Sequence, residues 1–188
     1  MALLNKSIST GRLLLRPYRK GEGKLIEGIL QRNLKRLKDA FPISIQLLLD
    51  GQNWEEYVEE KAKEWETGQS YYWGMWVRNP YEYIGNISIK HIQEGVPVAE
   101  VGYYLDEPYE GQGLMYEALE GAVAFAFQKL NIHQLILRID TNNAASNRLA
   151  EKLGFTNERL IPNGFETLDG QKLDVNYHTL SLPNYLKR

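Results

Sequence analysis

Residues 110–115 of this chain, Glu-Gly-Gln-Gly-Leu-Met, are the feature that most constrains its fold. They follow an extended run at residues 98–105 and open an apolar stretch at residues 114–130, in which Gly121 is the one helix breaker. This order predicts a strand, a glycine loop and a helix. Two glycines one residue apart let the backbone approach a ligand closely and turn sharply. The first N–H groups of such a helix, with the positive end of its dipole behind them, suit a phosphate or pyrophosphate, although a plain tight turn has the same pattern.

The rest of the chain predicts a mixed α/β sheet, mostly antiparallel and flanked by helices, in a single domain over residues 1–188. Strands are predicted from β-rich or alternating patterns at residues 10–18, 71–77, 83–89, 98–105, 134–140, 155–162 and 172–182. Helices are predicted from amphipathic spacing at residues 20–38, as one helix or a pair of short ones, and at residues 54–65, 114–130 and 144–153, whereas residues 43–53 are ambiguous. If the helix at 114–130 is a crossover, the strands on either side of it run parallel.

Composition excludes several classes of function. The chain has 188 residues and no cysteine, which removes disulfides, thiolate metal sites and a cysteine nucleophile. The net charge of −2 gives no nucleic-acid footprint, and the three histidines have no metal-ligand spacing. No apolar run reaches the length of a membrane span and no signal-peptide pattern is present, so a cytoplasmic protein is expected.

Four stretches, taken in this order, resemble the GNAT superfamily of acetyl-CoA-dependent N-acetyltransferases, and within it the ribosomal-protein N-terminal (alanine/serine) acetyltransferase group. Residues 10–17 resemble the opening Thr-x-Arg-Leu-x-Leu-Arg-Pro of that group, and residues 99–103 resemble the strand before the loop. Residues 110–115 stand where the superfamily has Gln/Arg-x-x-Gly-x-Gly/Ala. Residues 143–155 resemble Asn-x-x-Ser followed by Glu-Lys-x-Gly-Phe. The match covers nearly the whole chain.

The resemblance implies a GNAT-like domain that transfers an acetyl group from acetyl-CoA, without a metal, to a primary amine. The acceptor is a protein N-terminus or a small amine such as a polyamine, and the reaction needs no covalent enzyme intermediate. Related enzymes often form homodimers, but no interface can be derived from these residues. A non-catalytic acyl-CoA-binding domain is a competing interpretation. A dinucleotide-binding Rossmann enzyme is a weaker one, because the loop lacks a third glycine and lies mid-chain.

The sequence departs from the family pattern at three positions. Glu110 replaces the usual Gln or Arg, and Met115 replaces the usual small residue. Neither prevents binding of a pyrophosphate by backbone N–H groups, which do not depend on side chains. Ala150 stands where many members have a tyrosine general acid, so another group must serve.

By resemblance, the loop backbone is expected to bind the coenzyme A pyrophosphate, and the backbone of residues 103–105 its pantetheine arm. Asn143 and Ser146 would lie near the arm and the thiol, although both also fit a helix cap. Arg148 either reaches the phosphates or faces water. The full set of predicted cofactor-binding residues is Tyr103, Tyr104, Leu105, Glu110, Gly111, Gln112, Gly113, Leu114, Met115, Asn143, Ser146 and Arg148.

Glu100 and Ser146 are the predicted catalytic residues: Glu100 would help to deprotonate the amine, and Ser146 would assist departure of the thiolate. Glu100 lies in an otherwise apolar strand, where a carboxylate needs a use, an ion pair or a solvent-facing position. Tyr72, Trp76 and Asp174 are predicted to contact the acceptor, although the aromatic residues also suit a core and Asp174 an edge strand. The acidic face of residues 55–66 either attracts a cationic acceptor or is solvated.

Overall fold

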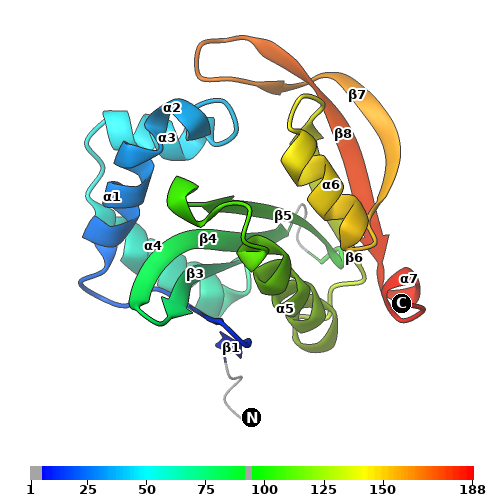
Figure 1. Ribbon diagram of the computed structural model, residues 1–188, viewed down its shortest axis with the longest axis horizontal. Helices are drawn as coiled ribbons and strands as arrows, with labels where there is room; N and C mark the ends of the chain where they lie inside the picture. Colours follow the sequence, from blue (N-terminus) through cyan, green and yellow to red (C-terminus); the bar gives the residue numbers. More distant parts are fainter. Residues whose placement is uncertain (1–5, 92–94) are drawn as a thin grey trace.

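The computed structural model describes residues 6–91 and 95–188, and within them the strands form one eight-stranded sheet in the order β1-β2-β3-β4-β5-β6-β8-β7 (Figure 1). Among these strands β5 and β6 run parallel, and every other neighbouring pair is antiparallel. The mixed, mostly antiparallel sheet predicted from the sequence is therefore confirmed. The strands are β1 (Ile8–Ser9), β2 (Leu13–Arg16), β3 (Ser70–Arg78), β4 (Tyr81–His91), β5 (Val98–Leu105), β6 (Gln134–Asp140), β7 (Thr156–Glu166) and β8 (Lys172–Ser181).

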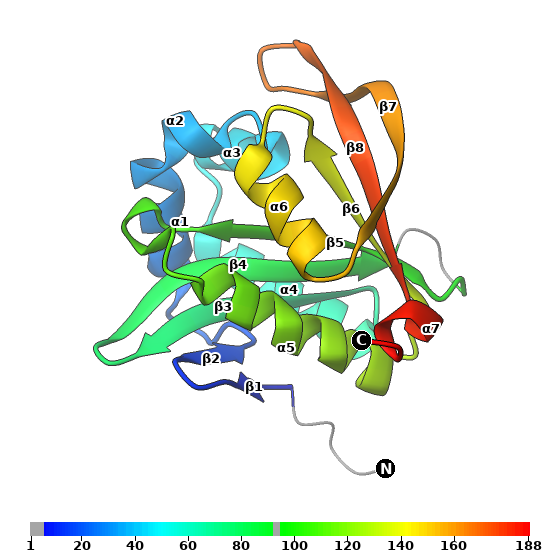
Figure 2. The same cartoon turned by 45° about the vertical axis from the view of Figure 1, so that its right-hand side comes forward.

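The sheet opens in its middle, because β5 and β6 separate partway along their length. They pair in parallel only up to Glu100 and Ile136. Beyond that point β5 continues to Leu105 beside β4, and β6 continues to Asp140 beside β8. Figure 2 shows β6 turning away from β5. The facing edges of these two strand ends are therefore not paired with each other.

Helices cover both faces of the sheet, with α5 and α6 on one face and α1 to α4 on the other (Figures 1 and 2). The crossover from β5 to β6 contains α5, as predicted, and is why these two strands are parallel. The helices are α1 (Gly23–Arg32), α2 (Leu34–Leu37), α3 (Pro42–Leu49), α4 (Trp54–Thr67), α5 (Leu114–Lys129), α6 (Ala144–Lys152) and α7 (Leu182–Tyr185), with a 3₁₀ turn, η1 (Glu107–Tyr109), after β5.

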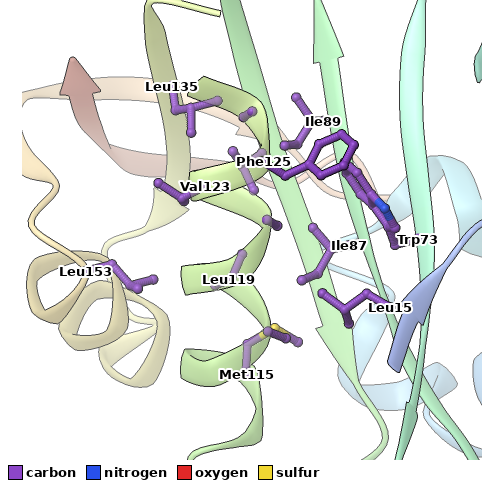
Figure 3. Close-up of a cluster of buried hydrophobic side chains, with 14 of the residues drawn as sticks. Leu15, Trp73, Ile87, Ile89, Met115, Leu119, Val123, Phe125, Leu135 and Leu153 are labelled. Atoms are coloured by element: carbon purple, nitrogen blue, oxygen red, sulfur yellow. The ribbon is translucent and has the colours of Figure 1, made fainter. Parts of the chain in front are cut away.

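The central helix α5 is apolar on more than one side because it lies between the sheet and α6. Met115 and Leu119, one turn apart, are buried toward strand residues that include Ile87 (Figure 3). Leu153, the C-cap of α6, belongs to the same cluster and lies on the far side of α5 (Figure 3). Each such side chain contributes about 1.5–3 kcal/mol when fully buried. This packing fixes the N-terminus of α5 beside the end of β5.

A second hydrophobic cluster lies between α1 to α4 and the opposite face of the sheet. Its strand residues are largely aromatic and include Tyr72 and Trp76, whose exposed fractions are 7% and 2%. The guanidinium of Arg16 stacks on the Trp76 ring, 3.6 Å from its centroid. The sequence analysis predicted that Tyr72 and Trp76 contact the acceptor, whereas in the structure the helices pack against this face and enclose both side chains.

Two segments differ from their predicted structure. The ambiguous residues 43–53 contain α3, which starts at Pro42; proline is well suited to the first turn of a helix because its missing N–H would be unpaired there anyway. The first predicted strand, residues 10–18, is shorter than expected. The Thr10 hydroxyl accepts a hydrogen bond from Leu13 N at 3.0 Å, which forms a turn before β2.

Candidate active site

The glycine loop ends β5 and leads into α5. Gly111 and Gly113 both have left-handed backbone angles, with φ values of +72° and +74°, which favour glycine. Gly113 is the N-cap of α5, and no side-chain hydrogen bond caps this helix in the part of the chain that the structure describes. The first N–H groups of α5 therefore stay available to a ligand, as predicted for an anion site.

Arg12 holds this loop in place through hydrogen bonds. The sequence analysis did not assign it a role. Its Nη1 donates to the Gln112 carbonyl at 2.9 Å, and its Nε donates to Glu117 on the first turn of α5 at 2.7 Å. In a trans peptide the C=O and the next N–H point in opposite directions. Because the Gln112 carbonyl points to Arg12, the N–H of Gly113 points away from it. Arg12 is the first arginine of the family motif at residues 10–17, and its place in that motif was the sequence signal that could have indicated a role for it.

The backbone of β5 alternates between β4 and the open edge. The Asp106 N–H donates to the Ile84 carbonyl of β4 at 2.8 Å. Since alternate residues of an antiparallel pair turn their backbone groups toward the partner strand, the even-numbered residues of β5 face β4. Val101, Tyr103 and Leu105 therefore turn their N–H and C=O groups toward the side from which β6 has diverged.

This alternation separates the three β5 residues predicted to bind a pantetheine arm. Tyr104 has its backbone groups on the β4 side, so they are not on the open edge. The Leu105 carbonyl already accepts a hydrogen bond from Arg36. Tyr103 is the residue of the three that has both backbone groups on the open edge and no described backbone partner there.

A cleft of about 330 Å³ occupies the space between the separated strands. On its floor, Glu100 of β5 and Arg138 of β6 form a two-point ion pair, with both oxygen–nitrogen distances at 3.0 Å. The Glu100 side chain is 32% exposed. The sequence analysis predicted that the Glu100 carboxylate has a use, an ion pair or a solvent-facing position, and the structure shows an ion pair that lines the cleft. The cleft is lined by Arg36, Asp39, Ala40, Phe41, Glu100, Val101, Gly102, Tyr103, Leu137, Arg138, Ile139, Asp140, Asn143, Ser146, Phe165, Leu173 and Val175.

The start of α6 forms one wall of the cleft. The Asn143 side chain accepts a hydrogen bond from the Ser146 N–H at 3.0 Å, so Asn143 is the N-cap of α6. Both residues line the cleft, so capping and a role in the cleft are compatible. Arg148 of α6 is exposed and is not part of the cleft lining.

Asn147, which the sequence analysis passed over, fixes the position of this helix end. Its side-chain N–H₂ donates to the Asp140 carbonyl at the end of β6, at 2.9 Å. Its Oδ1 accepts hydrogen bonds from Asn176 and from the Nε2 of His178 on β8, both at 2.9 Å. Burial lowers the pKa of His178, which keeps this imidazole neutral. The network holds Asn143 and Ser146 beside the separated strands.

The acceptor-side residues predicted from the sequence do not line the cleft. Tyr72 and Trp76 lie in the second core cluster. Asp174 is exposed, and its Oδ1 accepts a hydrogen bond from Asn163 N at 2.9 Å in the irregular part of β7. Its neighbours Leu173 and Val175 line the cleft instead, since successive side chains of a strand point to opposite faces. The acidic face of α4 contributes nothing to the lining.

Tyr103 and Ser146 both line the cleft, and the Tyr103 side chain packs against the cluster of α5 and α6. Burial raises the pKa of this phenol, and the nearby Ser146 hydroxyl offsets part of that effect. Ala150, the position at which the family often has a tyrosine, is fully buried in the core.

Within residues 6–91 and 95–188, no group of three or more His, Asp or Glu side chains is arranged to hold a metal ion. None of the helices described for this chain has the length and apolar character needed to cross a bilayer.

Comparison with known proteins agrees with this geometry. Residues 12–156 match the family model described as the acetyltransferase (GNAT) domain. The chain is 31% identical over 102 residues to the probable N-acetyltransferase YjcK of Bacillus subtilis, a match that spans 54% of this chain and 56% of that relative. It is 23% identical over 179 residues to the [ribosomal protein uS5]-alanine N-acetyltransferase of Escherichia coli, which covers 95% and 92% of the two chains.

A solved structure shares the fold. It is RimL, a ribosomal L7/L12 α-N-protein acetyltransferase in complex with coenzyme A, with a TM-score of 0.82 and 22% identity over 95% of this chain and 99% of that one. The family model alone covers more than half of the sequence. The predicted family resemblance is confirmed: this chain belongs to the GNAT acetyltransferase family and is an acetyl-CoA-dependent N-acetyltransferase.

Proposed function

We propose that this enzyme acetylates the N-terminal α-amine of a protein, of the ribosomal-protein type, by direct attack of the amine on acetyl-CoA in a ternary complex. Relatives named for uS5 and for L7/L12 support this substrate class. Such an acceptor also agrees with the cytoplasmic location expected from the sequence.

The observation that carries the proposal is the position of Glu100. It lies on the cleft floor where β5 and β6 separate, with both oxygens bonded to Arg138. A carboxylate has about four lone-pair positions, so it can still accept a proton from an amine or from a bridging water. A carboxylate held in an ion pair is a modest base, so it suits an acceptor amine of which a fraction is already neutral.

An α-amine meets that requirement better than a lysine side chain. With pKa values of about 8 and about 10.4, roughly a quarter of an α-amine but only about one lysine in a thousand is neutral at pH 7.5. The outer cleft also has an apolar wall, made by Phe41, Phe165 and Leu173, which suits the first side chains of a polypeptide.

The glycine loop and the open edge of β5 support a site for acetyl-CoA on the α5 and α6 side of the sheet. We propose that its pyrophosphate binds the loop N–H groups from Gln112 to Met115 and that its arm lies along the Tyr103 backbone, near Asn143 and Ser146. Arg148, exposed on α6, would contact the phosphates. The acetyl carbonyl would then lie between the separated strands, with Glu100 on the acceptor side.

The absence of cysteine supports direct attack of the amine, because the sequence offers no thiol to carry the acetyl group. The amine nitrogen forms the new bond to the carbonyl carbon, the bond to sulfur breaks, and the thiol of coenzyme A leaves. Initial velocities with both substrates varied should give intersecting lines, and acetyl-CoA alone should leave no acetyl group on the protein.

A small cationic amine is the second candidate acceptor. Three carboxylates, Asp39, Glu100 and Asp140, line the cleft together with two arginines, Arg36 and Arg138, so the lining carries a net negative charge. That charge favours a cation such as a polyamine. The acidic face of α4, which suggested the same substrate from sequence, lies elsewhere.

Turnover of acetyl-CoA with three acceptors distinguishes these functions. The acceptors are a lysine-free peptide with a free N-terminal alanine, the same peptide with a blocked N-terminus and one internal lysine, and spermidine. We expect the highest kcat/KM for the first. A higher value for spermidine would favour the second candidate, and turnover of the blocked peptide alone would refute α-amine specificity.

A further inference from the structure

Two buried side-chain polar atoms in the described part of the chain have no hydrogen-bond partner there, and one of them is the Tyr103 hydroxyl. The other is the Nδ1 of His178, whose ring is already held through Nε2. Leaving a buried hydroxyl unpaired costs stability, so native structures do it rarely and usually for a reason. Tyr103 is also part of the cleft lining.

The other buried tyrosines show what a structural hydroxyl looks like in this protein. On the opposite face of the sheet, the hydroxyls of Tyr18 and Tyr83 lie 3.0 Å apart, and those of Tyr83 and Tyr104 lie 3.3 Å apart. Asn86 donates to Tyr18 at 2.7 Å. These three phenols thus form hydrogen bonds with one another in the core. The Tyr103 hydroxyl, by contrast, lies within hydrogen-bond distance of no partner among the described residues, although Ser146 is near enough to affect its pKa, and Tyr103 is one of the residues that line the cleft.

Tyr103 and Glu100 lie on opposite faces of β5. They are three residues apart on a strand whose side chains alternate, and the side chain of Tyr103 packs with the α5 and α6 cluster. Ser146 at the start of α6 is its neighbour in the cleft. The Glu100 side chain therefore lies on one face of the sheet beside the opening, and the Tyr103 side chain lies on the other face.

We propose that the Tyr103 hydroxyl donates its proton to the sulfur of coenzyme A as the thioester bond breaks. This inference rests on the proposed function, because it requires acetyl transfer in this cleft. The amine nitrogen bonds to the carbonyl carbon, the carbon–sulfur electron pair moves to sulfur, and sulfur takes the phenol proton. The tyrosinate regains a proton from the one that the amine releases, through Ser146 or solvent, so the products are the amide and a neutral thiol.

The surroundings of Tyr103 suit a donor. Because burial raises the pKa of the phenol, it stays protonated at neutral pH and keeps its hydrogen available to the sulfur. Its backbone faces the open edge along which the arm of acetyl-CoA would extend. A single residue would thus hold the arm through its main chain and meet the sulfur through its side chain.

The test compares Tyr103→Phe with a matched control, Tyr83→Phe, which removes a buried hydroxyl that has partners. Three quantities are measured for each protein and for the wild type: the melting temperature without ligand, the ratio of Kd values for desulfo-CoA and CoA, and kcat. The Tyr103→Phe protein should melt no lower than the wild type, because it loses an unpartnered hydroxyl, whereas Tyr83→Phe should melt lower.

If the hydroxyl meets the sulfur, Tyr103→Phe should lose about fivefold to tenfold of the preference for CoA over desulfo-CoA, the usual worth of one hydrogen bond. Its kcat should fall by about 10²-fold or more, as for loss of a general acid. Tyr83→Phe should keep the wild-type preference. An unchanged CoA preference and kcat in Tyr103→Phe, or a loss of stability equal to that of Tyr83→Phe, would overturn the inference. Failure of the wild type to bind CoA or to turn over acetyl-CoA would instead refute the proposed function.

Discussion

Glu100 is at once an ion-pair partner and a carboxylate at the point where the parallel pairing of β5 and β6 ends. Its two hydrogen bonds to Arg138 hold it at the point where β5 and β6 separate. Arg138 thereby links the two strands across the end of their parallel pairing, and its guanidinium lines the cleft. The ion pair therefore fixes the carboxylate that we propose as the base, and both of its members line the cleft.

Replacing Glu100 by glutamine should lower turnover by about 10²–10⁴-fold at neutral pH if the carboxylate is the base. The loss should shrink as the pH rises toward the pKa of the α-amine, because more of the acceptor is then neutral without help. A pH–rate profile from pH 6.5 to 9.5 measures this. Glu158→Gln, on β7, is the matched control and should keep the wild-type profile. A Glu100→Gln enzyme with the wild-type rate at every pH would make Glu100 purely structural.

The sequence predicted the positions of residues better than their contacts. Glu100, Asn143 and Ser146 were identified by their motifs and all line the cleft. Tyr72 and Trp76, predicted to contact the acceptor, lie buried under the helices and outside this cleft, because strand periodicity tells which residues share a face but not what covers that face. Arg12 and Arg138 were missed because their partners, Gln112 and Glu100, are distant in sequence and no local pattern pairs them.

At the level of elements, the loop between β5 and α5 combines two left-handed glycines with an uncapped helix start. Its geometry is held from outside by Arg12 and Glu117. Burial by itself raises the pKa of Glu117, but hydrogen bonds from Thr10 and Arg12 outweigh this effect and the pKa lies below its usual value. The Glu117 carboxylate therefore stays charged and maintains its ion pair with Arg12.

Gly113→Ala should weaken binding of acetyl-CoA by about tenfold or more, because an alanine at φ +74° strains the peptide that presents the anion-binding N–H groups. The added Cβ itself has room, since its nearest neighbour is Arg12 Nη2 at 3.7 Å. Gly51→Ala, with φ +72° and open space around it, is the control for strain alone. Calorimetry should show wild-type affinity for the control. Equal affinities in all three proteins would rule out a pyrophosphate site at this loop.

The helices over the acceptor side are tied to the end of β5 through Asp106. Its carboxylate, 4% exposed, accepts hydrogen bonds from Arg32 at 2.5 Å and from Asn33 at 2.7 Å. Burial raises the pKa of Asp106, but these hydrogen bonds outweigh it, and the pKa lies below its usual value. The folded chain therefore binds this proton less readily than the unfolded chain does, so acid favours unfolding.

Asp106→Asn should lower the free energy of unfolding by about 1–3 kcal/mol at pH 7, the worth of hydrogen bonds to a charged group. The stabilisation is fully present above the unfolded pKa, near 3.9, and is lost as the pH falls through the lower folded value. Urea titrations at pH 7 and pH 3 should therefore show a smaller gap between wild type and variant in acid. Asp169→Asn, which breaks an exposed pair with Lys38, is the control and should change little. A gap of the same size at both pH values would contradict this account.

The regular elements were predicted more accurately than the irregular ones. The predicted limits of β5 and β6 agree with the structure because both strands are bounded by turn residues and carry strong β patterns. The β7–β8 hairpin supplies Phe165 and Leu173 to the cleft, yet its sequence predicted only a closing pair of strands. Its register shifts at residues 157–165 reorient these side chains, and irregular register depends on contacts with β6 and on turn geometry rather than on local alternation.

In the whole molecule, the opening between β5 and β6 connects the two faces of one sheet. The face covered by α5 and α6 carries the glycine loop, Tyr103 and Ser146. The face covered by α1 to α4 carries Glu100 and the apolar wall that includes Phe41. We infer that donor and acceptor approach from these two sides and meet where the strands separate, an arrangement that is compatible with the direct attack proposed above.

The central claim is that an α-amine is the acceptor, and its most direct test is the site of acetylation on a peptide that offers two amines. The substrate is a peptide with a free N-terminal alanine and one internal lysine, incubated with the enzyme and acetyl-CoA at pH 7.5. Tandem mass spectrometry of the first product locates the acetyl group. We predict that it is on the α-amine, with the lysine unmodified until the N-terminus is consumed. Acetylation of the lysine first, or of both amines equally, would contradict the account.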